Sequence, residues 1–250
     1  KVEIEGAINA HKKDAKAVRE FLAYFYKELK KGNYYTEYEL GEILTSFRAK
    51  QEGYIMDSFP PIVGFQDNGA IIHYRAKEKG SKLIKGNGLL LIDSGAHYLE
   101  GTTDVTRVVA IGEPMQEQKR NFTLVLKGHI RLLQAKFPKG TTGHALDALA
   151  RYDLWQERKD YKHGTGHGVG SFLSVHEGPQ SISPRYNPAK IEAGMVLSNE
   201  PGFYVDGQYG IRIESLLLVE EFNKDFLQFK TLTLAPIDFN LIDFQLLTKI

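Results

Sequence analysis

Residues 89–109 read LLLIDSGAHYLEGTTDVTRVV. The apolar run at its start predicts a strand that ends at Asp93, and a second run after a glycine-containing turn predicts another strand. Alternation along a strand puts Asp104 and Thr106 on one face. A hairpin of this kind brings two carboxylates together, which costs free energy unless a cation lies between them. A divalent metal is the usual cation, although two solvated aspartates would fit this segment alone.

The composition of the chain limits the classes of function that fit it. It has 250 residues, 42% hydrophobic and 25% charged, which predicts one large or two small globular domains. A net charge of +1 gives no electrostatic basis for a nucleic-acid partner, and no apolar run approaches the length of a membrane span. Cysteine is absent, so His, Asp and Glu must hold any metal. Because Lys1 is not a native start, we expect a fragment or a processed chain.

Hydrophobic periodicity predicts helices before and between the strands. We expect helices over residues 8–30, 115–137 and about 145–154. Another helix should begin at a capping box formed by Thr36 and Glu39. The segment around Pro60 and Pro61 is interpreted as irregular and followed by a short strand at 70–74. Further strands are expected at 195–200, 209–219 and 231–235. This order predicts an α+β fold with a mainly antiparallel sheet.

Further residues that could carry chemistry lie downstream of the hairpin. His163 and His167 are four residues apart in a loop with glycines at 164, 166, 168 and 170, so a helix is improbable there. The glycines instead indicate close backbone approach and positive φ angles. Glu200 ends a strand, and Glu214 lies in a run that reads as buried. Its alternative interpretation is a buried ion pair with Arg212 on the same strand face.

Together these positions supply four carboxylates and one histidine, which carry too much negative charge for a single ion. Two divalent ions bridged by carboxylates would balance that charge, and such a pair activates water for hydrolysis. The hard oxygen ligands favour Mn²⁺, with Co²⁺ or Zn²⁺ as alternatives.

Several motifs in the chain closely resemble those of the pita-bread metallopeptidases, the family of methionine aminopeptidase, prolidase, aminopeptidase P and creatinase. They occur in the family's order and read Asp93-Ser-Gly-Ala, Gly101-Thr-Thr-Asp104-Val-Thr-Arg, His163-Gly-Thr-Gly-His167-Gly-Val-Gly, Ser198-Asn-Glu200-Pro-Gly and Gly210-Ile-Arg-Ile-Glu214-Ser. Residues 171–183, SFLSVHEGPQSIS, resemble the cytosolic, multi-domain Xaa-Pro aminopeptidases rather than prolidase. The resemblance implies the pita-bread fold and a cytoplasmic location. It also implies that residues 1–250 are one catalytic domain of a longer protein, whose N-terminal domains and C-terminal tail are missing here.

The resemblance also implies a role for each matching residue. It implies that the metal ligands are Asp93, Asp104, His167, Glu200 and Glu214. Asp104 and Glu214 would bridge both ions. Glu200 would in addition act as general base or proton shuttle. The catalytic and substrate-contacting histidines would be His73, His163 and His176, and Arg212 would lie on the substrate side or behind the ligands.

The activity implied by the resemblance is hydrolysis of the N-terminal Xaa-Pro bond by a metal-bridging hydroxide. The substrate would be a peptide with proline at its second position. A homodimer is implied for the full-length protein, but no nucleic-acid or membrane partner. The alternatives are prolidase, which cleaves only dipeptides, methionine aminopeptidase, and an inactive peptide-binding domain of the same fold. Inactive modules of this kind usually lack metal ligands, whereas all the ligand positions are filled here.

Overall fold

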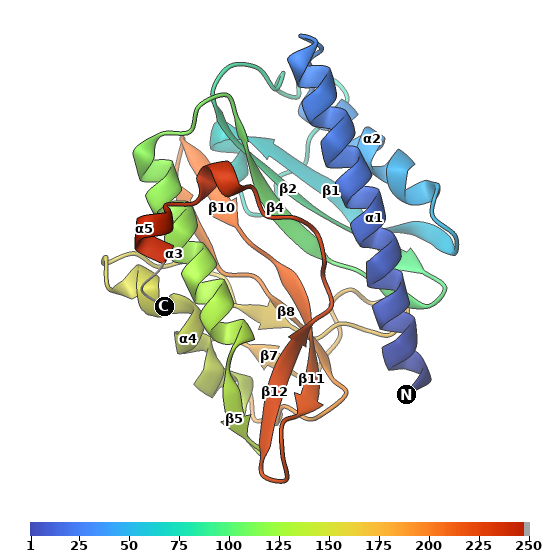
Figure 1. The fold of residues 1–250 in the computed structure, drawn as a ribbon, viewed down its shortest axis with the longest axis vertical. Helices are drawn as coiled ribbons and strands as arrows, with labels where there is room; N and C mark the ends of the chain where they lie inside the picture. Colours follow the sequence, from blue (N-terminus) through green and yellow to red (C-terminus); the bar gives the residue numbers. More distant parts are fainter. Residues whose placement is uncertain (248–250) are drawn as a thin grey trace.

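The computed structural model describes residues 1–247, and its centre is a curved antiparallel sheet (Figure 1). Strand β2 (Gly88–Tyr98) lies in the middle of this sheet and pairs with β1 (Tyr54–Phe65) on one side and β4 (Val105–Ile111) on the other. The short strand β3 (Gly101–Thr102) folds back on the end of β2. The predicted hairpin is therefore present, with Asp93 opposite Thr106.

Side chains along β2 alternate between two hydrophobic cores. Leu90 and Ile92 face the helices α1 (Val2–Lys30) and α2 (Glu37–Ala49), which cover one side of the sheet in Figure 1. Leu89 and Leu91 belong to the other core. By the same alternation Asp93 shares the face of Leu89 and Leu91, so the sheet delivers its carboxylate to the interior of the molecule.

The second half of the chain covers that other face. Helices α3 and α4 pack side by side there, and a second antiparallel sheet with the order β5-β12-β11-β8 closes the lower part of the molecule (Figure 1). The remaining elements in chain order are η1 (Gln66–Ala70), α3 (Gln116–Leu133), β5 (Lys136–Pro138), α4 (Gly143–Trp155), β6 (Gly166–His167), β7 (Ser181–Ile182), β8 (Val196–Asn199), β9 (Gly202–Val205), β10 (Tyr209–Arg212), β11 (Ser215–Glu221), β12 (Phe226–Thr231), η2 (Phe239–Leu241) and α5 (Phe244–Leu247).

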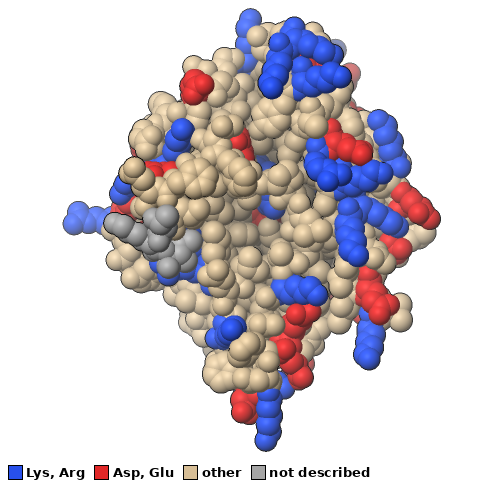
Figure 2. All heavy atoms as spheres, in the orientation of Figure 1, with Lys and Arg blue, Asp and Glu red and all other residues tan. Residues whose placement is uncertain are grey.

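The α+β class with antiparallel pairing is confirmed, and so is the Thr36–Glu39 capping box. The predicted helices are present, but the one expected over 115–137 ends at Leu133, and Lys136 and Phe137 belong to strand β5. Helix α1 begins six residues earlier than expected, at Val2. Within residues 1–247 no helix is long and apolar enough to cross a lipid bilayer. The face in Figure 2 carries Lys and Arg side chains with Asp and Glu side chains among them, including along α1.

Three strand predictions were wrong. The predicted strand at 70–74 is a 3₁₀ turn and loop, and Ile71 is 54% exposed. The strand instead runs through Pro60 and Pro61, because β1 is an edge strand whose register shifts between Phe59 and Ile62, where the prolines need no ladder hydrogen bond. The strand expected at 231–235 is β12, which ends at Thr231. The strand expected at 209–219 is interrupted between Arg212 and Ser215.

A buried histidine on α3 gives a first testable prediction. His129 is 6% exposed, and burial together with the charge of Arg107 lowers its pKa to about 3. The unfolded chain takes up this proton near pH 6.5 and the folded chain does not, so protonation favours unfolding as the pH falls below 6.5. In His129→Gln, the slope of unfolding free energy against pH between about 6 and 4 should be shallower by up to about 1.4 kcal/mol per pH unit. Urea unfolding at several pH values measures this slope; equal slopes in both proteins would contradict the prediction.

Candidate metal centre

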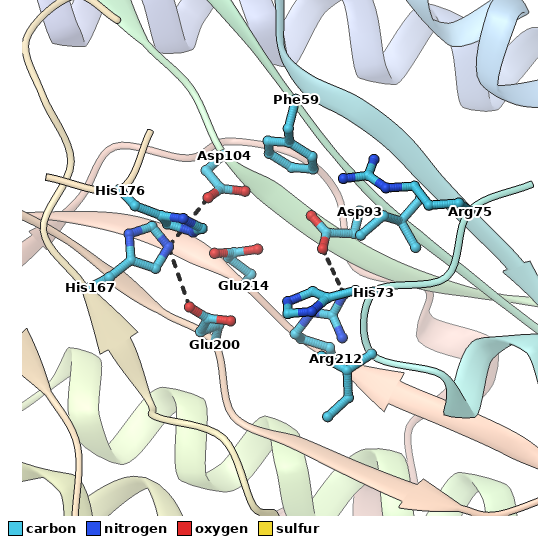
Figure 3. A pocket seen from close by; sticks show the side chains of 12 residues that line it. Phe59, His73, Arg75, Asp93, Asp104, His167, His176, Glu200, Arg212 and Glu214 are labelled. Atoms are coloured by element: carbon cyan, nitrogen blue, oxygen red, sulfur yellow. Dashed lines mark hydrogen bonds and ion pairs between the residues drawn. The ribbon is translucent and has the colours of Figure 1, made fainter. Parts of the chain in front are cut away.

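The candidate residues meet in a cavity of about 350 Å³ between the two sheets (Figure 3). Its lining combines carboxylates, histidines and arginines with a few apolar side chains. These residues are Phe59, Ile62, Ile72, His73, Arg75, Asp93, Asp104, His167, His176, Glu200, Arg212 and Glu214. Every predicted metal ligand is therefore present in one cavity.

Two aspartates come from the central sheet. Asp93 lies in the middle of β2 rather than at its end, and Asp104 immediately precedes β4. They are only 8% and 4% exposed. Among the described residues, neither Asp93 Oδ1 nor Asp104 Oδ1 has a hydrogen-bond partner. A buried carboxylate oxygen without a donor is unfavourable, so these two atoms require a cation or a proton.

Glu214 enters the cavity from the break between β10 and β11. Its backbone N–H donates to the carbonyl of Thr106, and the hydroxyl of Thr106 donates to Glu214 Oε2 over 2.7 Å. Residue 214 thus leaves the strand pairing of β10 and β11 and is held by β4 instead. This connection explains why the predicted continuous strand is interrupted here.

The glycine-rich loop holds His167 against β8. A Cβ at Gly166 would lie 2.1 Å from the carbonyl oxygen of Ser198, and one at Gly168 would lie 1.9 Å from that of Glu177. The predicted close approach is therefore confirmed. The predicted positive φ angles are not found at these glycines, and positive φ occurs instead at Leu173 and Ser174. The loop contains the short strand β6 and no helix, as expected.

The hydrogen bonds of His167 fix which of its nitrogens can bind a metal. Nδ1 lies 2.9 Å from the carbonyl oxygen of Gly168, which can only accept, so Nδ1 carries the proton. The lone pair of Nε2 then faces Asp104 Oδ2 and Glu200 Oε1, each 3.4 Å away. A lone pair directed at two carboxylates is the arrangement that a bound cation stabilises.

The pKa values of the carboxyl groups also favour a bound cation at this cavity. Burial raises the pKa of Asp104 and of Glu214 well above the ordinary range, and repulsion from neighbouring carboxylates adds to the effect. Burial also raises the pKa of Glu200, although the nearby His167 opposes it. These carboxyl groups are costly to ionise together without cations, which supply the missing positive charge.

The donor atoms fall into overlapping groups that suit more than one cation. In each group one ligand atom per residue lies within 4.8 Å of the others. The groups are Asp93–Asp104–Glu214, His167–Glu200–Glu214 and Asp104–His167–His176. Asp104, His167 and Glu214 each occur in two groups, so the groups overlap at these three residues. The set of oxygen and imidazole donors fits hard or borderline divalent cations.

Arg212 does not pair with Glu214. Its Nη2 donates to Asp93 Oδ2 over 2.6 Å, its Nη1 to the hydroxyl of Tyr204 over 2.9 Å, and its Nε to that of Thr106 over 3.2 Å. The side chain is 2% exposed, so the guanidinium is buried beneath the carboxylates. The arginine therefore holds Asp93 in place, and the alternative Arg212–Glu214 ion pair is wrong.

The remaining predicted histidines occupy different places. His73 and His176 line the cavity, and the ring of His176 packs edge-on against His167 with centroids 4.1 Å apart. His163 is not among the lining residues: its Nε2 lies 2.8 Å from the hydroxyl of Tyr204, so it contacts the centre through that tyrosine and Arg212. Burial lowers the pKa of His163 to about 4, which keeps it neutral.

Sequence reasoning missed Tyr204, Phe59 and Arg75. Tyr204 lies in β9, a strand that was not predicted from the sequence. Phe59 lies in a segment that was interpreted as irregular, and Arg75 follows the wrongly predicted strand at 70–74, so their meeting at the cavity was not predicted. For none of them did the sequence provide a motif.

Comparisons with known proteins agree with this geometry. Residues 5–221 match the model of metallopeptidase family M24. The chain is 46% identical to a probable Xaa-Pro aminopeptidase P of Coprinopsis cinerea, over 99% of this chain and 41% of that protein. It is also 46% identical to aminopeptidase P2 of Arabidopsis thaliana, over 98% of this chain and 36% of the relative. It thus spans about two fifths of the length of such relatives.

Solved structures show the same fold. The X-prolyl aminopeptidase of Caenorhabditis elegans, described as a cytosolic enzyme with a di-nuclear active site, matches with a TM-score of 0.95 and 45% identity over 99% of this chain and 41% of that one. The Xaa-Pro dipeptidase of Bacillus anthracis matches with a TM-score of 0.80 and 28% identity over 94% of this chain and 61% of that one. These matches confirm the predicted pita-bread fold. The chain belongs to metallopeptidase family M24.

Proposed function

We propose that this chain is the catalytic domain of a metal-dependent Xaa-Pro aminopeptidase, which removes the first residue of a peptide whose second residue is proline. The observation that carries the proposal is the convergence of Asp93, Asp104, His167, Glu200 and Glu214 on one cavity. The similarity to aminopeptidases P of fungal, plant and nematode origin over nearly the whole chain supports the same activity.

The cations expected here are two divalent ions, and Mn²⁺ fits the oxygen-rich donor set best, with Co²⁺ or Zn²⁺ as alternatives. Asp93, Asp104 and Glu214 would hold one, and His167, Glu200 and the shared Asp104 and Glu214 the other. When bound, such ions supply Lewis acidity and an activated water for hydrolysis.

Several side chains of this domain are placed to handle protons and substrate. Ser198 Oγ donates to Glu200 Oε1 over 3.0 Å, which orients the carboxylate and leaves Oε2 available to accept a proton and pass it to the leaving proline nitrogen. His73 and His176, both exposed at the cavity, can donate to the oxygen that gains negative charge in the transition state. His163 and Arg212 orient the centre through Tyr204 and Asp93.

The domain organisation, assembly and location of the enzyme are part of the same proposal. We propose that residues 1–250 form a single catalytic domain, that the complete protein is a homodimer, and that it acts in the cytoplasm, the location stated for the Caenorhabditis elegans enzyme. Its partners would be peptides, with neither nucleic acid nor membrane required.

The test is a comparison of three substrates with the Mn²⁺-loaded chain. Ala-Pro-Gly should release alanine, whereas Ala-Ala-Gly should be cleaved at least about tenfold more slowly, since tertiary-amide selectivity is worth a few kcal/mol. The dipeptide Ala-Pro should be a poorer substrate than the tripeptide. Cleavage of the dipeptide alone would favour prolidase instead, and binding of Ala-Pro-Gly without cleavage would indicate an inactive peptide-binding domain.

A further inference from the structure

Arg75 is an unneutralised cation at the wall of the candidate active site. Its side chain lines the cavity, and its Nη1 donates to the carbonyl oxygen of Pro60 over 2.6 Å. Within residues 1–247 this is its only hydrogen bond, and no carboxylate lies within ion-pair distance of it. A guanidinium has five N–H donors, so most of them are free to bind a ligand.

Arg212, the other arginine of the cavity, has its hydrogen-bonding groups occupied by the protein. All three nitrogens of Arg212 donate to protein groups, including the carboxylate of Asp93, and the side chain is buried. Arg212 therefore positions the protein side chains of the cavity, and each of its nitrogens already has a protein partner. Arg75 is exposed and is oriented by a single hydrogen bond to a backbone carbonyl. Its remaining N–H groups can therefore bind an anionic ligand.

The backbone around Arg75 is fixed, so its position is defined. The adjacent Tyr74 donates its hydroxyl proton to the buried carboxylate of Glu37 over 2.7 Å, and Pro60 belongs to strand β1. Figure 3 shows Arg75 beside Phe59 on the Asp93 side of the cavity, away from His167 and Glu200. The apolar Phe59, Ile62 and Ile72 belong to the same lining.

From this arrangement we propose that Arg75 forms a carboxylate-binding subsite for the part of the substrate beyond the prolyl residue. The inference rests on the proposed peptidase function and adds a preference to it. The amino terminus of a substrate is cationic and is attracted to the acidic cluster, so the anionic groups it can offer Arg75 are carboxylates farther along. A guanidinium binds carboxylates in a bidentate manner, which adds orientation as well as affinity. Arg75 therefore favours peptides with a carboxylate at the third residue.

That carboxylate has two sources, the free C-terminus of a tripeptide or an acidic side chain. Three substrates distinguish them: Ala-Pro-Gly, Ala-Pro-Gly-amide and Ala-Pro-Asp-amide, each assayed with the Mn²⁺-loaded chain. If the C-terminus is bound, kcat/KM for Ala-Pro-Gly exceeds that for its amide by about tenfold. If a side chain is bound, Ala-Pro-Asp-amide shows the advantage instead.

The variant Arg75→Gln tests whether this arginine causes the preference. It should lose the roughly tenfold advantage, mostly through KM, while its activity on Ala-Pro-Gly-amide stays within about twofold of wild type. Arg75→Lys should retain part of the preference, because it keeps the charge but not the bidentate geometry. The matched control is Lys77→Gln, which removes an exposed charge from the same segment but outside the cavity lining, and it should change nothing.

Binding supplies a readout that does not require turnover. The affinity of the Mn²⁺-loaded protein for the dipeptide Pro-Gly should exceed its affinity for prolyl-glycinamide in wild type but not in Arg75→Gln, as measured by calorimetry. An equal loss of activity on all three substrates in Arg75→Gln would overturn the subsite, as would a wild type whose kcat/KM does not depend on the carboxylate. If no substrate is cleaved but the calorimetric preference is present, the proposed activity fails and the subsite stands.

Discussion

The Asp104→Asn variant should bind at most one divalent ion per chain where the wild type binds about two, and it should hydrolyse Ala-Pro-Gly at least about 10³-fold more slowly. We expect Asp104 to bridge both cations, since it occurs in two overlapping donor groups, which also contain Asp93, Glu214, His167 and His176. An amide in its place offers one weak acceptor and no charge, so both cation positions lose a ligand.

The same variant should be more stable than the wild type when no metal is present. Burial and neighbouring carboxylates raise the pKa of Asp104, so its ionised form destabilises the metal-free fold at neutral pH. A neutral asparagine removes that penalty, and the midpoint of thermal unfolding should rise by about 2–4 °C for each kcal/mol gained. Loss of metal combined with higher metal-free stability cannot result from misfolding.

Elemental analysis after Mn²⁺ loading, thermal unfolding with and without Mn²⁺, and the peptide assay give the three measurements. Asp206→Asn is the matched control, because Asp206 is an exposed turn residue outside the cavity and loses the same charge. A wild type that binds no metal would contradict the catalytic proposal for this chain. An Asp104→Asn protein that keeps about two ions would contradict the bridging role.

The sequence predicted how the hairpin and the glycine loop place their side chains, because this placement follows from local rules. Alternation along two paired strands is sufficient to place Asp104 and Thr106 on one face, and the register Asp93–Thr106 agrees with it. The glycines around His167 likewise indicate close backbone approach wherever they occur. The roles of these residues came from the resemblance of the motifs, and they are still to be tested.

Features that depend on contacts distant in sequence were not predictable. Pro60 and Pro61 argue against a strand locally, yet β1 tolerates them because it is an edge strand with an irregular register, which only the tertiary structure determines. The partner of Arg212 is Asp93, 119 residues away, whereas the sequence suggested the nearby Glu214. Spacing along the chain could not distinguish these two carboxylates.

Glu37 is another residue whose role depends on contacts distant in sequence, and its substitution should have a large effect on stability. Glu37 and Glu39 are both acidic residues in the first turn of α2, but the sequence pattern singled out only Glu39, as the partner of Thr36 in the capping box. Glu39 does cap the helix and is exposed, while Glu37 is 0% exposed. Glu37 Oε1 accepts from the N–H of Phe65 and from Asn68, and Oε2 accepts from Asn68, from the Tyr74 hydroxyl and from the N–H of Lys82.

Every neighbour of the Glu37 carboxylate is thus a donor, so an isosteric glutamine cannot replace it. Whichever way the amide is turned, its NH₂ group faces donors and leaves buried polar groups unpaired. Glu37→Gln should lower the free energy of unfolding by about 3 kcal/mol, or the unfolding midpoint by about 6–12 °C. Because the carboxylate fixes Tyr74 next to His73, kcat/KM for Ala-Pro-Gly should also fall by about tenfold while the bound Mn²⁺ is unchanged.

Glu39→Gln is the matched control, since it makes the same substitution in the same helical turn at an exposed cap and should cost no more than about 1 kcal/mol. Glu37 acts as a positioning residue for the loop with His73, so its variant should lose kcat at saturating substrate and keep its metal content. A variant that loses metal together with activity would show that Glu37 supports the whole fold rather than that loop. Equal stability of Glu37→Gln and Glu39→Gln would show that the five hydrogen bonds to Glu37 do not depend on a charged acceptor.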